Sequence, residues 1–160
     1  MVNILQMLKY TPSKIKKKTV KTVKSIRLVK AVYDTDEYGR HQKAMFKVTA
    51  TTIPRKVTIK MYGKIDTPYN HRKSWVHCSC EWFTFFCEYS LAKRKSSTII
   101  NSNGNAPVET NPRQWPFICK HIVATLNRLP KVKYKMPKIK PGEEELEFFL
   151  KEIEKYIPGA

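Results

Sequence analysis

The chain has 160 residues, a length that suits a single domain with a modest hydrophobic core. Lysine and arginine total 31 against 13 aspartate and glutamate residues, so the formal net charge is +18, and 41% of the residues are apolar. This balance predicts a folded protein with a polyanionic partner, and the lack of long apolar runs leads us to expect neither a signal peptide nor a transmembrane helix.

Residues 1–33 are predicted to form a basic N-terminal arm that folds as a first strand or as a helix. Val20, Val23, Ile26 and Val29 recur at every third position within it, which favours an amphipathic helix, whereas its many threonines and valines favour a strand. Periodicity does not decide between the two. The lysines predicted to contact nucleic acid or an acidic partner are Lys14, Lys16, Lys17, Lys18, Lys21 and Lys24 in this arm, with Lys131, Lys133 and Lys135 near the other end.

Residues 34–130 are predicted to form the central domain, which starts with a small antiparallel sheet. The polar segment at 34–40 contains a glycine and predicts a hairpin loop. Apolar residues then alternate with polar ones at 44–50 and at 57–61, which predicts two half-buried strands. A third strand is predicted at 74–77, directly before the first cysteine pair.

A helix is predicted from about residue 119 to residue 129, because apolar residues recur with helical spacing between Pro116 and Pro130. The preceding segment at 101–116 is rich in asparagine, glycine and proline and predicts a loop. A loop of this length is unusual in a compact domain, so we expect it to be ordered by contacts.

Two further segments are predicted to follow this helix. Residues 131–142 alternate lysine with apolar residues and contain prolines, which predicts an extended basic linker. Residues 143–160 predict a C-terminal amphipathic helix, because glutamates in its first turn favour the positive end of the helix dipole. Its apolar stripe, which needs a surface to pack on, consists of Leu146, Phe149, Leu150, Ile153 and Ile157.

The four cysteines are not expected to form disulfides in a reducing cytoplasm, so metal binding and catalysis remain as their roles. Cys78 and Cys80 would point to one face of a strand, whereas Cys119 and His121 would start the predicted helix, whose N-terminus favours a thiolate. Three thiolates and one imidazole are ligands that tetrahedral Zn²⁺ prefers. The sequence therefore predicts a zinc site formed by these four residues, with a structural rather than a catalytic role.

The same residues permit other interpretations, which the sequence favours less. Buried thiols with a surface histidine would not explain why three of the four cysteines fall in two such closely spaced pairs. A nucleophilic Cys119 with His121 as its base lacks an oxyanion-donor motif and a third orienting residue. Cys87 and His77 could compete for the ion, but Cys87 lies among phenylalanines and favours a core position, and His77 alternates with Cys78 on the strand.

The order Cys-x-Cys, long spacer and Cys-x-His at a helix start resembles the SWIM-type zinc finger, whose four ligands match residues 78, 80, 119 and 121. The resemblance covers residues 75–129. The sequences CSCEWFTFFCEYSLAKRKSSTIINSNG and PVETNPRQWPFICKHIVATL are more specifically similar to SWIM-like proteins encoded by tailed bacteriophages. The spacer is longer than in most cellular SWIM fingers and contains Cys87. The resemblance implies a strand and helix module around zinc that binds DNA or proteins without catalysis.

We therefore expect an α+β fold in which a small antiparallel sheet and a zinc-anchored helix carry a basic N-terminal arm and a C-terminal amphipathic helix. No paired acids with a nucleophile, no glycine-rich phosphate loop and no open metal position are recognisable, so no catalytic residue is predicted. Neither a membrane nor a small-molecule substrate is expected as a partner.

The expected function is that of a structural zinc-binding protein in the head, neck or tail of a bacteriophage virion, where it docks on acidic surfaces of other virion proteins. The phage resemblance implies a location in the virion or in the bacterial host cytoplasm, and not secretion. The alternative function is non-specific binding of DNA or another nucleic acid by a zinc finger, since the basic segments could neutralise phosphates.

Overall fold

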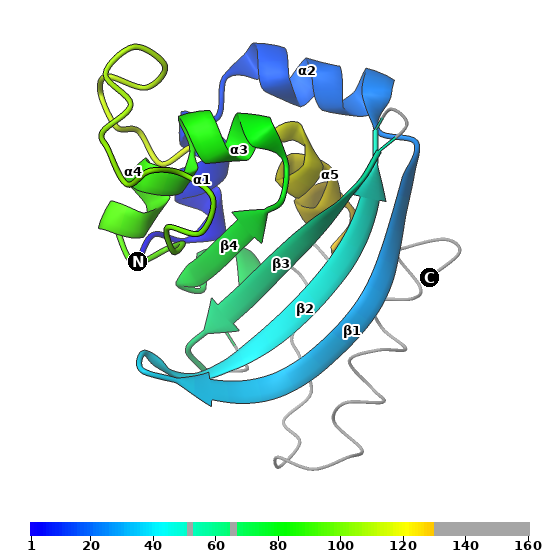
Figure 1. Cartoon of the computed structure of the whole chain (residues 1–160). Coiled ribbons are helices and arrows are strands. Elements are labelled where there is room, and N and C mark those ends of the chain that lie inside the picture. The colour runs from blue at the N-terminus through cyan, green and yellow to red at the C-terminus, as the bar shows by residue number, and fades with distance from the viewer. Residues whose placement is uncertain (51–52, 65–66, 130–160) are drawn as a thin grey trace.

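The computed structural model describes residues 1–50, 53–64 and 67–129 (Figure 1). Over these residues the fold is α+β, with helices packed on a small antiparallel sheet, which confirms the fold class at this level. None of the described helices is long and apolar enough to cross a membrane. Outside the described residues lie the predicted linker at 131–142, the predicted helix at 143–160, and three of the predicted partner-binding lysines, Lys131, Lys133 and Lys135.

A four-stranded antiparallel sheet forms the centre of the domain, with its strands in chain order. All the strands predicted from alternation are present. The first hairpin turns at Glu37 and Tyr38, inside the predicted loop, and Gly39 follows with a φ of 107° that a side chain would disfavour. The strands are β1 (Ser25–Asp36), β2 (Gly39–Thr49), β3 (Pro54–Tyr62) and β4 (Ser74–Cys78).

The helices gather on one side of the long strands (Figure 1). The predicted helix after Cys119 is present as α5, which packs against β2, β3 and β4. Two short helices occupy the aromatic-rich segment after Cys80, for which no element was predicted. The helices are α1 (Ile4–Tyr10), α2 (Ser13–Thr22), α3 (Glu81–Phe86), α4 (Glu88–Lys93) and α5 (Lys120–Arg128), with a 3₁₀ turn η1 at Tyr69–His71.

Side-chain alternation gives the sheet two different faces. On β2, Phe46 and Val48 are fully buried, whereas Lys47 between them is exposed. The buried face packs against α5, which contributes Ile122 and Leu126 to the same core. This packing fixes the start of α5 near the end of β4, where the cysteine pairs lie.

The segment predicted as a basic N-terminal arm is folded into the domain. Both predicted alternatives, a helix and a strand, occur one after the other: helix α2 ends at Thr22, and strand β1 begins at Ser25. The segment also contributes to the core, since Ile4 and Met7 of α1 are fully buried members of it. A reciprocal capping box at Asn3 starts α1 and holds these apolar side chains in register with the core.

Candidate metal centre

The predicted ligands sit at the ends of three elements that pack together. Cys78 is the last residue of β4, and Cys80 is the N-cap of α3. Between them, Ser79 is tied to β3: its N–H donates to the carbonyl of Lys56 (3.0 Å), and its Oγ accepts from the N–H of Lys56 (2.9 Å). Cys119 is the N-cap of α5. Each cysteine is therefore held by backbone structure.

The structure brings together all four predicted ligands. The ligand atoms of Cys78, Cys80, Cys119 and His121 all lie within 4.8 Å of one another, and all four residues are buried. Neighbouring donors of a tetrahedral zinc ion are about 3.8 Å apart when its Zn–S bonds measure 2.3 Å. Cys119 Sγ lies 4.0 Å from His121 Nδ1, close to that spacing. The residues present thus fit a metal ion, for which they supply three sulfur donors and one nitrogen donor.

Hydrogen bonds and burial give the thiols of the ligand group different pKa values. Hydrogen bonds from Cys119 and then from Cys78 lower the pKa of Cys80, and the backbone N–H of Phe83 also donates to Cys80 Sγ at 3.3 Å. Burial raises the pKa of Cys119 well above its usual value. Cys80 is therefore the thiol most ready to lose its proton, and metal binding must release protons from the others.

The two possible competitors lie outside this ligand group. Cys87 is fully buried where α3 meets α4, and burial raises its pKa well above the usual value. His77 is directed away from the group, with its Nε2 3.3 Å from Oε1 of the buried Glu88 and its ring edge-on to Phe83. Their surroundings match the expected positions, a core thiol and a histidine on the other face of β4.

A basic cavity of about 250 Å³ borders the ligand group, and Cys80, Cys119 and His121 form part of its wall. Its cationic residues are Lys18 of α2, Arg55 of β3 and Lys120 of α5. Lys18 was predicted to contact a partner, but Arg55 and Lys120 were not, because only the tertiary fold brings them together. Of the other predicted lysines in the described part of the chain, Lys14, Lys17, Lys21 and Lys24 are exposed, and Lys16 is partly buried.

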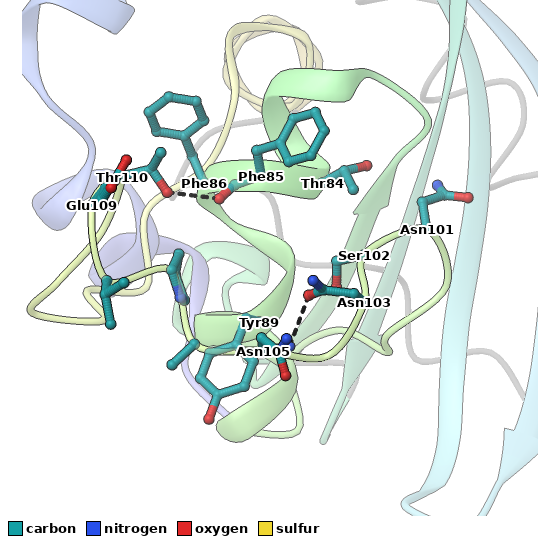
Figure 2. Close-up of a pocket in the computed structure, with 13 residues that line it drawn as sticks. Thr84, Phe85, Phe86, Tyr89, Asn101, Ser102, Asn103, Asn105, Glu109 and Thr110 are labelled. Carbon is teal, nitrogen blue, oxygen red and sulfur yellow. Dashed lines mark hydrogen bonds between the residues drawn. The ribbon is translucent and has the colours of Figure 1, made fainter.

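A larger cavity, of about 690 Å³, lies between residues 101–110 and the junction of α3 with α4 (Figure 2). The carboxylate of Glu88 accepts hydrogen bonds from the backbone N–H groups of Asn101 (3.3 Å) and Ser102 (2.8 Å). Thr110 Oγ1 donates to a backbone carbonyl at the end of α3 (2.9 Å). These contacts confirm that the long loop is ordered. No lysine or arginine is among the described residues that line this cavity, so it is unsuited to phosphate.

The chain was compared with protein-family models, with curated protein sequences and with solved structures. None of the three comparisons gives a significant match.

Proposed function

We propose that this protein holds one structural zinc ion and acts as a non-enzymatic interaction module. The observation that carries the proposal is the buried group of three cysteines and one histidine, whose ligand atoms lie within 4.8 Å of one another. This donor set is typical of structural zinc sites, and four protein ligands leave no coordination position for water or substrate. The proposed role of zinc is to join the end of β4 to the start of α5.

The proposed partner is polyanionic, and the first candidate is an acidic surface on another protein, as in the expected phage particle. Support comes from α2, which contains five lysines and no acidic residue. Lys14, Lys17 and Lys21 are exposed on this helix, whereas Thr19 is buried on the side that packs against α5. The helix is thus fixed to the metal-bearing part of the domain while its charge stays accessible.

Nucleic acid is the second candidate partner, and the cavity beside the ligand group favours it. Lys18, Arg55 and Lys120 converge there from three elements, and Trp82 forms part of the same wall. Glu81 also lines the cavity, so its three cations exceed its acidic groups by two, and cations beside an aromatic side chain suit a phosphate and an adjacent base.

Cobalt substitution tests the closed, structural character of the metal site. Full-length protein loaded with Co²⁺ should show the absorption of a tetrahedral ion with thiolate ligands. Because four protein donors fill that coordination sphere, added azide should leave the spectrum unchanged. A spectrum that shifts on azide addition would reveal an open position and would contradict the structural role.

Binding measurements test the interaction part of the proposal. Zinc-loaded and zinc-free protein are each mixed with a polyglutamate peptide and with a DNA duplex over a range of salt concentrations. We expect zinc-dependent binding to at least one of the two polyanions, since the basic groups are positioned by elements that the metal joins. Failure to bind either one at low salt would contradict the function.

A further inference from the structure

The side of the sheet that faces away from α5 carries basic residues that the metal site does not use. Strand register places Arg27 of β1 opposite Lys47 of β2, and Lys47 opposite Lys56 of β3. These cations form a row across three strands. Lys30 lies on the same face of the sheet as this row, because it is paired with Met45, which is two residues from Lys47. Lys43 lies on this face as well, because it is two residues from Met45 along β2. We call these five residues the basic sheet face.

The charges of the basic sheet face are not balanced within the described part of the chain. No ion pair joins any of its residues to another described residue. The neighbouring Lys60 differs, because its Nζ lies 3.0 Å from a carboxylate oxygen of Asp36. Like charges directly opposite one another on a sheet have Cβ atoms about 5 Å apart and repel each other. The three residues of the central row are exposed, and their mutual repulsion would be relieved by an anionic partner.

The described helices leave this surface open. Figure 1 shows that α1, α2, α3 and α5 lie on the other side of the long strands. A cavity of about 380 Å³ lies among these cations, with Lys47 and Lys56 in its wall. Its apolar lining residues are Val29, Met45, Phe46 and Pro54. The surface is thus broad, positively charged and fixed by strand backbone.

We propose that the basic sheet face binds the phosphate backbone of duplex DNA. The inference rests on the proposed polyanion-binding function and names a surface and a partner class for it. Lysine is depleted in protein–protein interfaces, whereas this face presents five cations, with acidic residues of β1 only near the first hairpin, at Asp34 and Asp36, which suits a phosphate lattice. Trp75, in the cross-strand row of Lys43 and Lys60, is covered by Lys60 Nζ at 4.7 Å and stacked on His77. These two contacts compete with the stacking of an unpaired base on Trp75, which favours a duplex over a single strand as the partner.

The test is fluorescence anisotropy of a labelled DNA duplex with zinc-loaded, full-length protein across a salt series. The test variant is Arg27→Gln/Lys47→Gln/Lys56→Gln. The matched control, Lys9→Gln/Lys64→Gln/Lys73→Gln, removes the same charge from exposed positions elsewhere. Each phosphate contact contributes about 0.9 to the slope of log affinity against log salt, so the test variant should lose about 2.7 of that slope. The control should keep the wild-type slope.

Three outcomes would overturn the inference. Equal losses in both variants would mean that the overall charge, and not this face, drives binding. Loss of binding only in a Lys14→Gln/Lys17→Gln/Lys21→Gln variant would move the DNA site to α2 and leave the proposed function standing. A wild-type protein that binds polyglutamate or single-stranded DNA in preference to the duplex would exclude duplex DNA as the partner of this face.

A single substitution in the row should change the stability of the fold and the binding of the duplex in opposite directions. Lys47→Glu places an acid between Arg27 and Lys56, so it should raise the thermal unfolding midpoint of the free protein by removing cross-strand repulsion. The same substitution should weaken duplex binding at least as much as Lys47→Gln. A Lys47→Glu protein that is folded and binds the duplex as tightly as wild type would contradict the inference.

Discussion

Cys80 combines two roles that are usually held by different residues. As the N-cap of α3 its sulfur accepts the backbone N–H of Phe83, a position at which serine or aspartate is more common. As a member of the ligand group it also faces the other buried thiols. The N–H bond to sulfur favours the thiolate that a metal needs, so the start of α3 and the chemistry of the site are coupled at one residue.

At the same scale, the buried Tyr69 predicts a pH dependence of stability. Its hydroxyl donates to the carbonyls of Leu126 and Leu129 at the end of α5, and burial raises its pKa to about 12. A raised phenol pKa gives stability that is complete below the unfolded pKa near 10.0 and is lost as pH rises through about 12. Tyr69→Phe should lower the unfolding free energy by about 1 kcal/mol at pH 8.

That advantage of the wild type over Tyr69→Phe should shrink and then reverse between pH 10 and pH 12, because only the wild type must keep a buried phenol protonated. Urea unfolding of both proteins at a series of pH values measures the difference between their unfolding free energies. The contributions of the other tyrosines cancel in this difference. A difference that stays constant to the alkaline limit would show that Tyr69 is solvated and does not hold the end of α5.

At the scale of elements, Glu88 links α4, β4 and the long loop. Its side chain is fully buried, pairs with His77 and accepts the N–H groups of Asn101 and Ser102. Burial alone would raise its pKa, but the hydrogen bonds from Ser102 and Asn101 outweigh burial and keep the pKa below the usual value. One carboxylate thus holds the first residues of a loop that has no regular secondary structure, and Thr110 holds the loop further along.

Glu88→Gln should weaken the hold on this loop, because a neutral amide oxygen accepts the N–H groups of Asn101 and Ser102 less strongly than a carboxylate does, and the second oxygen, which also accepts from Asn101, is lost. We expect the unfolding free energy to fall by about 1–3 kcal/mol and amide exchange to accelerate at Asn101 and Ser102. Glu109→Gln, an exposed position in the same loop, is the matched control and should change neither quantity. Unchanged exchange in Glu88→Gln would mean that other contacts order the loop.

The elements that could be predicted are those with a clear period. Alternation predicted β2 and β3, and helical spacing with proline boundaries predicted α5. By contrast, α3 and α4 have six residues each, too few for a helical period to emerge among consecutive aromatic residues. The ligand set was predictable because its members fall in close pairs.

Other features of the site depend on tertiary structure and leave no mark on local sequence. Glu88 is 13 residues from Asn101, and its role depends on how the loop folds back over α4. The row formed by Arg27, Lys47 and Lys56 depends on strand register, since a shift by one residue would place these cations in the core. Neither feature could be predicted from the sequence without knowing how the loop folds and how the strands pair.

At the scale of the whole molecule, a chain with a net charge of +18 folds around one hydrophobic core, to which all the described helices and strands except α2 contribute. Self-repulsion opposes compaction in such a chain, and a metal that joins β4 to α5 would offset part of it. The ligand group draws on residues up to 43 positions apart, from Cys78 to His121. Closing that span with a metal restricts the unfolded chain as a crosslink does.

The most direct measurement is the zinc content of full-length protein after dialysis, determined together with circular dichroism. Wild type and Cys87→Ala should each retain one equivalent of zinc, because Cys87 is a buried thiol outside the ligand group. Cys78→Ser and Cys119→Ser should lose the metal and most of the folded signal, since structural zinc supplies folding free energy. Stoichiometric zinc and an intact fold in Cys119→Ser, or loss of zinc in Cys87→Ala, would contradict the account.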